Sequence, residues 1–205
     1  MSSIPSIKGS AFSKVVEDVG KLLDTGALSR SDAARFLQPE DLALLGKEVV
    51  VSRWYDIRCY ERMSQLLLEV EGHGNPEYLR ERGRRTARRL LEAGLYAQFE
   101  YLQRTEASRT QDPGERFVAF GRDLRLLNTL SASILNFTKW SSRQDPDHPR
   151  RYQIVLSEAA AMPEVLCWTT DGFVNQMAAQ RGHGDLWRWE RVERSVIVFR
   201  MNGEI

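Results

Sequence analysis

Apolar side chains recur at intervals of three and four residues through most of the first three-quarters of the chain, which is typical of amphipathic helices. The clearest case follows Asp112-Pro113. Its apolar positions are Phe117, Phe120, Leu124, Leu127, Leu130, Ile134 and Phe137. They form one continuous stripe, so the sequence predicts a long helix from Phe117 to Phe137 with one buried face.

The same spacing, bounded by Ser, Pro, Asp and Gly residues, predicts further helices upstream. They are expected over residues 10–23, 29–37, 39–45, 56–70, 75–94 and 95–106. Asp56 is positioned to cap the helix that follows it. Between the helices, residues 48–52 (EVVVS) predict an extended linker or a short strand.

The last quarter of the chain has a different pattern. Residues 151–156 (RYQIVL) predict a strand, Pro163 begins a helix to about Gln180, and residues 186–192 and 195–201 predict a hairpin because they are rich in Trp, Val, Ile and Phe. The segment before them, 144–150, is dense in Pro and Asp and predicts a loop. The fold class is therefore α+β: a mostly helical N-terminal three-quarters, then a strand–helix–strand–strand unit with a small antiparallel sheet.

The length of 205 residues fits one domain. Residues 1–9 predict a flexible tail, and residues 10–205 predict a single α+β domain. Within that domain, residues 10–47 predict an N-terminal helical extension, 48–140 a helical part, and 150–205 the part that contains the sheet.

Charge argues against a nucleic-acid partner. The chain has 29 basic and 28 acidic residues, a net charge of +1, whereas nucleic-acid binding normally needs a broad positive surface. Six arginines cluster between Arg80 and Arg89. Glu81 lies four residues before Arg85, and Arg88 lies four before Glu92, so these charges are expected to pair along a solvated helix face.

Residues 1–8 lack the features of a signal peptide, and no apolar run approaches the roughly twenty residues of a membrane helix. We therefore expect a cytoplasmic protein with no membrane span.

Catalytic and metal motifs are missing from the sequence. The histidines His73, His148 and His183 lie apart in segments rich in Gly, Pro or Asp, and Cys59 and Cys167 form no CxxC. No GxSxG, Walker loop or GxGxxG is present. We expect a protein that is not an enzyme and that holds no metal or other cofactor, with both cysteines buried and reduced.

Aromatic residues gather near the C-terminus. Trp168 and Phe173 lie on the predicted helix, and Trp187 and Trp189 fall on one face of the following strand. Two interpretations stay open: a sheet face packed solidly on a helix, or an aromatic-lined cavity that holds an apolar molecule.

Two stretches resemble a known superfamily. They are YQIVLSEAAAMPEVLCWTTDGFVNQMAAQRG with LWRWERVERSVIVFRM, and the upstream series IKGSAF, PEDLALL, SRWYDIRCYERM and FGRDL. The first is similar to the domain shared by 4-vinyl reductase (hydrocarbon-binding) proteins, haem NO-binding sensors and TRAPP vesicle-tethering subunits. The upstream series is similar to a functionally uncharacterised bacterial family found in myxobacteria. That family is related to the same superfamily.

The resemblance implies a ligand-sensing or scaffolding domain that often forms a homodimer. Haem and zinc are not expected, because the Tyr-x-Ser-x-Arg clamp of the haem sensors and the clustered cysteines of related zinc domains are missing. We expect a non-enzymatic module with an apolar pocket between the long helix and the C-terminal sheet. Its expected lining is Phe120, Leu127, Ser131, Trp168 and Phe173. The alternative is a protein-interaction module, dimerising or tethering-like, with no ligand.

Overall fold

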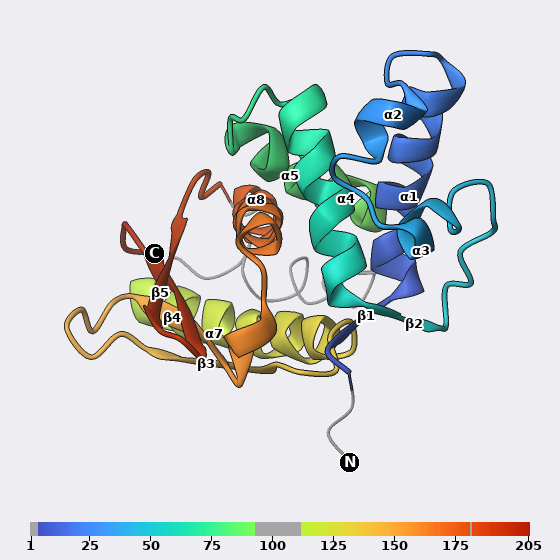
Figure 1. The fold of residues 1–205 in the computed structure, drawn as a ribbon. Helices are drawn as coiled ribbons and strands as arrows, with labels where there is room; N and C mark the ends of the chain where they lie inside the picture. Colours follow the sequence, from blue (N-terminus) through green and yellow to red (C-terminus); the bar gives the residue numbers. More distant parts are fainter. Residues whose placement is uncertain (1–3, 93–111, 181) are drawn as a thin grey trace.

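A computed structural model describes residues 4–92, 112–180 and 182–205. The architecture is α+β with a small antiparallel sheet near the C-terminus, as the sequence predicted. Figure 1 shows the N-terminal helices gathered on one side of the molecule and the sheet on the other, with helix α8 between them.

Four N-terminal helices follow the predicted spacing. Their bounds are α1 Gly9–Asp24, α2 Arg30–Ala33, α3 Pro39–Leu42 and α4 Ile57–Val70. The apolar positions expected to face inward on α1, such as Phe12 and Val19, are fully buried. The Asp56 carboxylate caps α4 by accepting a hydrogen bond from the Arg58 backbone N–H at 2.9 Å, as expected.

Residues 6–9 correct the expectation of a flexible tail that extends over residues 1–9. Ser6–Lys8 form strand β1, which pairs antiparallel with β2, Trp54–Asp56. Ile7 is 1% exposed, and Gly9 already begins α1. A three-residue strand has no periodicity of its own, and its position depends on a partner almost fifty residues away. For the same reason the short strand lies at 54–56 and not at 48–52.

Two longer helices follow, α5 at Glu77–Glu92 and α7 at Pro113–Ala132. The helix predicted over 95–106 lies outside the described residues. α7 ends before the predicted Phe137, because the backbone after Ala132 bonds to β1 instead. The Ile134 carbonyl accepts a hydrogen bond from the Lys8 N–H at 2.9 Å, and Leu135 forms a β-bridge with Ile7.

The sheet has four strands in the order β3-β4-β6-β5, all antiparallel. Their bounds are β3 Lys139–Gln144, β4 Tyr152–Ser157, β5 Trp187–Glu193 and β6 Val196–Met201. A 3-10 turn at Ala159–Ala161 leads into α8, Glu164–Ala179. The sequence did not predict β3. Its residues, KWSSRQ, form an edge strand that is mostly exposed and polar, so they lack the apolar pattern typical of a strand.

Candidate functional site

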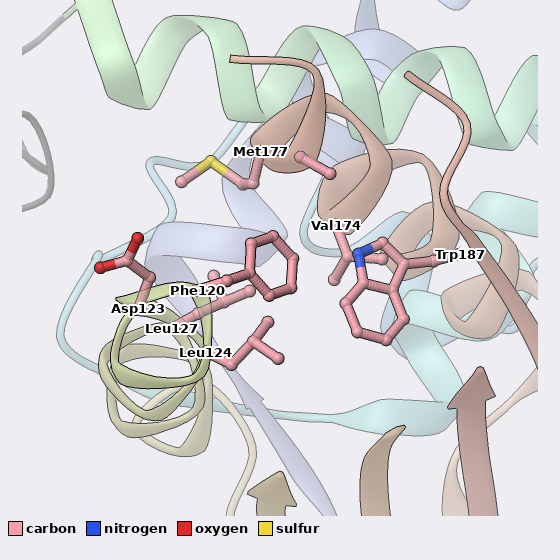
Figure 2. Close-up of a pocket in the computed structure, with 8 residues that line it drawn as sticks. Phe120, Asp123, Leu124, Leu127, Val174, Met177 and Trp187 are labelled. Carbon is pink, nitrogen blue, oxygen red and sulfur yellow. The ribbon is translucent and has the colours of Figure 1, made fainter. Parts of the chain in front are cut away.

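The aromatic cluster between α7 and the C-terminal elements is closely packed. Phe120 stacks on Trp187 with ring centroids 6.2 Å apart, and Trp168 meets Trp189 edge-to-face at 5.2 Å. Figure 2 shows Phe120 and Leu124 of α7 directed toward Val174 of α8 and toward Trp187. The void that these side chains leave has a volume of about 20 Å³, enough for roughly one water molecule. For Trp168, Trp187 and Trp189, the packing supports the interpretation as a solid core.

A much larger cavity lies on another side of α8. It is bounded by α1, α5, α8 and the segment from the end of α7 to the start of β3, and its volume is about 520 Å³. Cavities that hold small molecules typically measure 300–1,000 Å³. The expected pocket between the long helix and the sheet is therefore displaced: the space of ligand size faces the N-terminal helices.

A close crossing of α5 and α8 sets one wall of this cavity. A Cβ atom on Gly83 would lie 1.9 Å from the Thr169 carbonyl oxygen, and one on Gly172 would lie 1.8 Å from the Arg80 carbonyl oxygen. Any side chain at these two positions would collide with the backbone of the other helix. The two glycines thus allow the helices to touch backbone to backbone.

A buried network joins this crossing to the aromatic cluster. The Arg80 guanidinium donates to Asp171, which is fully buried, at 2.7 Å and to Asp185 at 2.6 Å. Asn175, one turn after Asp171 on α8, accepts from the Trp187 N–H at 2.7 Å and donates to the Trp187 carbonyl at 3.0 Å. The start of β5 is therefore fixed to α8, and α8 is fixed to α5.

Apolar side chains make up much of the cavity wall. They come from β1, α1, α5, α8 and residues 134–140: Ile7, Ala11, Val15, Leu22, Leu90, Ile134, Leu135, Trp140, Leu166 and Phe173. The indole N–H of Trp140 donates to the Thr138 hydroxyl at 3.1 Å. Since that polar group is satisfied outside the cavity, the Trp140 ring contributes an apolar surface to it.

Charged side chains line the α1 and α5 walls. Asp18 of α1 pairs with Arg82 of α5 at 2.6 Å and with Lys14 at 2.8 Å. Burial alone would raise the pKa of Asp18, but hydrogen bonds and charge from Lys14 and Arg82 outweigh it and lower that pKa below its usual value. Asp18 is therefore a carboxylate held between two cations.

The arginine run on α5 pairs differently from the sequence expectation. Glu81 binds Arg88 at 2.5 Å and Arg84 at 3.4 Å, and not Arg85. Arg84 lies one turn from Glu81, at a spacing that favours pairing, whereas Arg88 reaches Glu81 from two turns away with its long side chain. Arg85 is exposed and lines the cavity.

The five residues expected to line a pocket fall into three places. Phe173 and Ser131 line the 520 Å³ cavity, while Phe120 and Leu127 line the small void in the aromatic cluster. Trp168 packs against Trp189, and its indole N–H donates to Glu164 at 3.3 Å. The structure therefore places Phe173 with Ser131 and Phe120 with Leu127, but it does not bring all five residues to one site.

Sequence reasoning missed the contributions of α1 and α5 to the cavity. Two features pointed there: Gly83, a small residue within a highly charged helix, and the excess of arginines over acids on α5. Neither determines which helix packs opposite.

Both cysteines are buried and unpaired by disulfide, as expected. Burial is the main cause that raises their pKa values, to about 12 for Cys167. Such thiols are poor nucleophiles. Within residues 4–92, 112–180 and 182–205, no group of three His, Cys, Asp or Glu side chains is placed to hold a metal ion.

No protein-family model and no curated protein matches this chain. Among solved structures, it is similar to an H-NOX protein from S. oneidensis in the Fe(II)NO ligation state. The two share 9% sequence identity with a TM-score of 0.45, over 95% of this chain and 98% of that one. Among the described helices, none is long and apolar enough to cross a membrane.

Proposed function

We propose that this protein is a non-enzymatic binding module that holds a small, largely apolar molecule in the cavity between α1, α5 and α8. The observation that supports the proposal is the cavity itself, whose volume of about 520 Å³ is lined by Trp140, Phe173 and aliphatic side chains. A ligand that binds against these apolar side chains would remove their surface from contact with water, which favours binding.

A binding role accounts for the chemistry of the lining better than catalysis does. The described lining has no His or Cys side chain, and its two carboxylates, Asp18 and Glu71, each already have a partner in Arg82 and Tyr78. General acid–base or nucleophilic catalysis needs such groups poised for a substrate.

We do not extend the proposal to a haem. Haem iron is held in proteins mostly by His, Cys or Met, with Tyr in some cases. The described lining contains none of the first three, and its one tyrosine, Tyr60, is 4% exposed. The donor set of this cavity therefore does not fit an iron porphyrin.

We propose that the chain belongs to the superfamily of 4-vinyl reductase, haem NO-binding and TRAPP domains through the myxobacterial family, and that it acts in the cytoplasm. The support is the similarity of its C-terminal segment and of the upstream series from IKGSAF to FGRDL.

The rival function, a homodimer or partner surface along the long helix, has less support. Such a surface would expose a row of large apolar side chains. Along the described side chains of α7, Val118 is the large hydrophobic that is exposed, at 57%, whereas Phe120, Leu124 and Leu127 are buried.

The test is binding of the neutral dye N-phenyl-1-naphthylamine, which fluoresces in apolar surroundings. We expect saturable binding with one site per chain. Ala11→Phe should weaken it at least tenfold, because the ring fills the cavity from α1. Glu17→Phe adds the same ring to an exposed position of the same helix and should leave binding unchanged. A wild-type protein without saturable binding would contradict the proposal, as would equal binding by both variants.

A further inference from the structure

The cavity carries more positive charge than the chain as a whole. Its described lining has five cationic side chains, Lys14, Lys21, Arg82, Arg85 and Arg89, and two carboxylates, Asp18 and Glu71. This is an excess of three positive charges, while the whole chain has a net charge of +1. The rest of the chain is therefore net negative, and the positive charge is concentrated at the cavity.

Part of this charge is neutralised within the wall. Asp18 lies between Lys14 and Arg82, at 2.8 and 2.6 Å. Glu71 accepts a hydrogen bond from the Tyr78 hydroxyl. Three cations remain, Lys21, Arg85 and Arg89, and among the described side chains no carboxylate lies within ion-pair distance of them.

The positions of these cations follow from two helical stripes that face each other. Arg82, Arg85 and Arg89 are spaced i, i+3 and i+7 on α5, so they share one side of that helix. Asp18 and Lys21 share one side of α1 in the same way. The Asp18–Arg82 ion pair joins the stripes.

Arg85 and Arg89 are exposed although they line the cavity. They therefore lie where the cavity meets solvent. Trp140, Leu166 and Phe173 lie on the other elements, on α8 and at the start of β3. The space thus has an apolar wall and a basic wall that is open to water.

We infer that the ligand of this cavity is an amphiphilic anion, with its apolar body against Trp140 and Phe173 and its carboxylate or phosphate head on Arg85 and Arg89. The inference rests on the proposed binding function and names the ligand class. Guanidinium groups bind both kinds of head through paired N–H donors. A neutral molecule would leave the basic wall unused, and a cation would be repelled by it.

The test compares four ten-carbon probes that displace N-phenyl-1-naphthylamine from the purified full chain: decanoate, decyl phosphate, 1-decanol and decylammonium. We expect decanoate or decyl phosphate to bind at least tenfold more tightly than 1-decanol, and decylammonium to bind most weakly. The advantage of the anions should shrink as salt is raised from about 0.01 to 1 M, since salt screens exposed charges. Which of the two anions binds more tightly distinguishes a carboxylate from a phosphate head.

Variants locate the head group. The double change Arg85→Gln with Arg89→Gln should reduce anion affinity about tenfold and leave 1-decanol binding unchanged. Lys21→Gln should have a smaller effect in the same direction. Arg88→Gln with Arg84→Gln is the matched control, because it removes the same charge from the same helix at arginines that pair with Glu81.

The outcomes separate this inference from the proposed function. Equal binding of decanoate and 1-decanol would overturn the inference and leave the apolar cavity as a binding site. If the control variant Arg84→Gln with Arg88→Gln lost as much anion affinity as Arg85→Gln with Arg89→Gln, the inference would also be overturned, because the loss would then reflect the overall positive charge of α5. Failure of all four probes and of the dye to bind would overturn the proposed function itself.

Discussion

Helix α8 has two sides that meet very different surroundings. On one side Val174 and Met177 pack against α7 and Trp187, and the remaining void is about 20 Å³. On the other, Leu166 and Phe173 border a cavity of about 520 Å³ with charged side chains from α1 and α5. Val174 and Phe173 are neighbours in the chain and both are apolar, so side-chain type does not determine which of them lies in the core and which borders the cavity. The difference comes from the elements packed against each side: α7 and Trp187 on one, α1 and α5 on the other.

The largest expected effect concerns the packed side. Leu127 is 2% exposed in the middle of α7, so Leu127→Ala should lower the free energy of unfolding by about 2–5 kcal/mol. Urea denaturation measures this change. A loss below about 0.5 kcal/mol, as for a surface substitution, would show that this side is not a close-packed core.

Enlarging the two neighbouring residues on α8 sharpens the comparison. Val174→Phe should cost about 1–3 kcal/mol of stability, because the packed side has no room for a ring. Phe173→Trp should cost less than about 1 kcal/mol, because the added ring enters the cavity, and should weaken dye binding. The same urea titration compares the two, and equal costs would remove the distinction between the sides.

The smallest expected change in stability concerns Asp185, which forms an ion pair with Arg80 of α5. The hydrogen bond from Arg188, with help from Arg80, lowers the pKa of Asp185 from 3.8 to about 2. A carboxyl with a lowered folded-state pKa adds stability above its unfolded pKa and loses it as the pH falls through the folded one.

Asp185→Asn should therefore lower the free energy of unfolding at pH 7 by no more than an exposed ion pair contributes, about 0–1 kcal/mol. The difference from wild type should shrink between pH 4 and 2. Denaturation at several pH values tests this. A difference that grows in acid would contradict the assigned ion pair.

The sequence predicted most helices and the terminal hairpin, because each has its own periodicity and its own stop residues. Residues 6–9 and β3 were missed for a physical reason: Ser6–Lys8 gain strand structure only from Trp54–Asp56, and KWSSRQ only from pairing with β4. The end of α7 was misplaced because Ile134 continues the helical spacing while its carbonyl bonds to Lys8.

The candidate site was predictable only in part. Ser131 and Phe173 were expected to line a pocket from side-chain type and helix phase, and both border the large cavity. Phe120 and Leu127 were selected on the same basis but face the packed side. The cavity depends on α5 crossing α8 at Gly83 and Gly172 and on α1 lying beside α5 at the Asp18–Arg82 pair. One sequence does not show which helices pair in space.

Contact quenching of tryptophan tests most directly whether a ligand occupies the cavity and not the aromatic cluster. Trp140 lines the cavity, whereas Trp187 is 1% exposed in the packed cluster. A bromine atom quenches indoles that it touches, so 11-bromo-1-undecanol should quench part of the protein's emission with saturation at one site per chain. We predict that Trp140→Phe abolishes the quenched fraction and that Trp187→Phe preserves it. Quenching that disappears with Trp187 and persists without Trp140 would contradict the account.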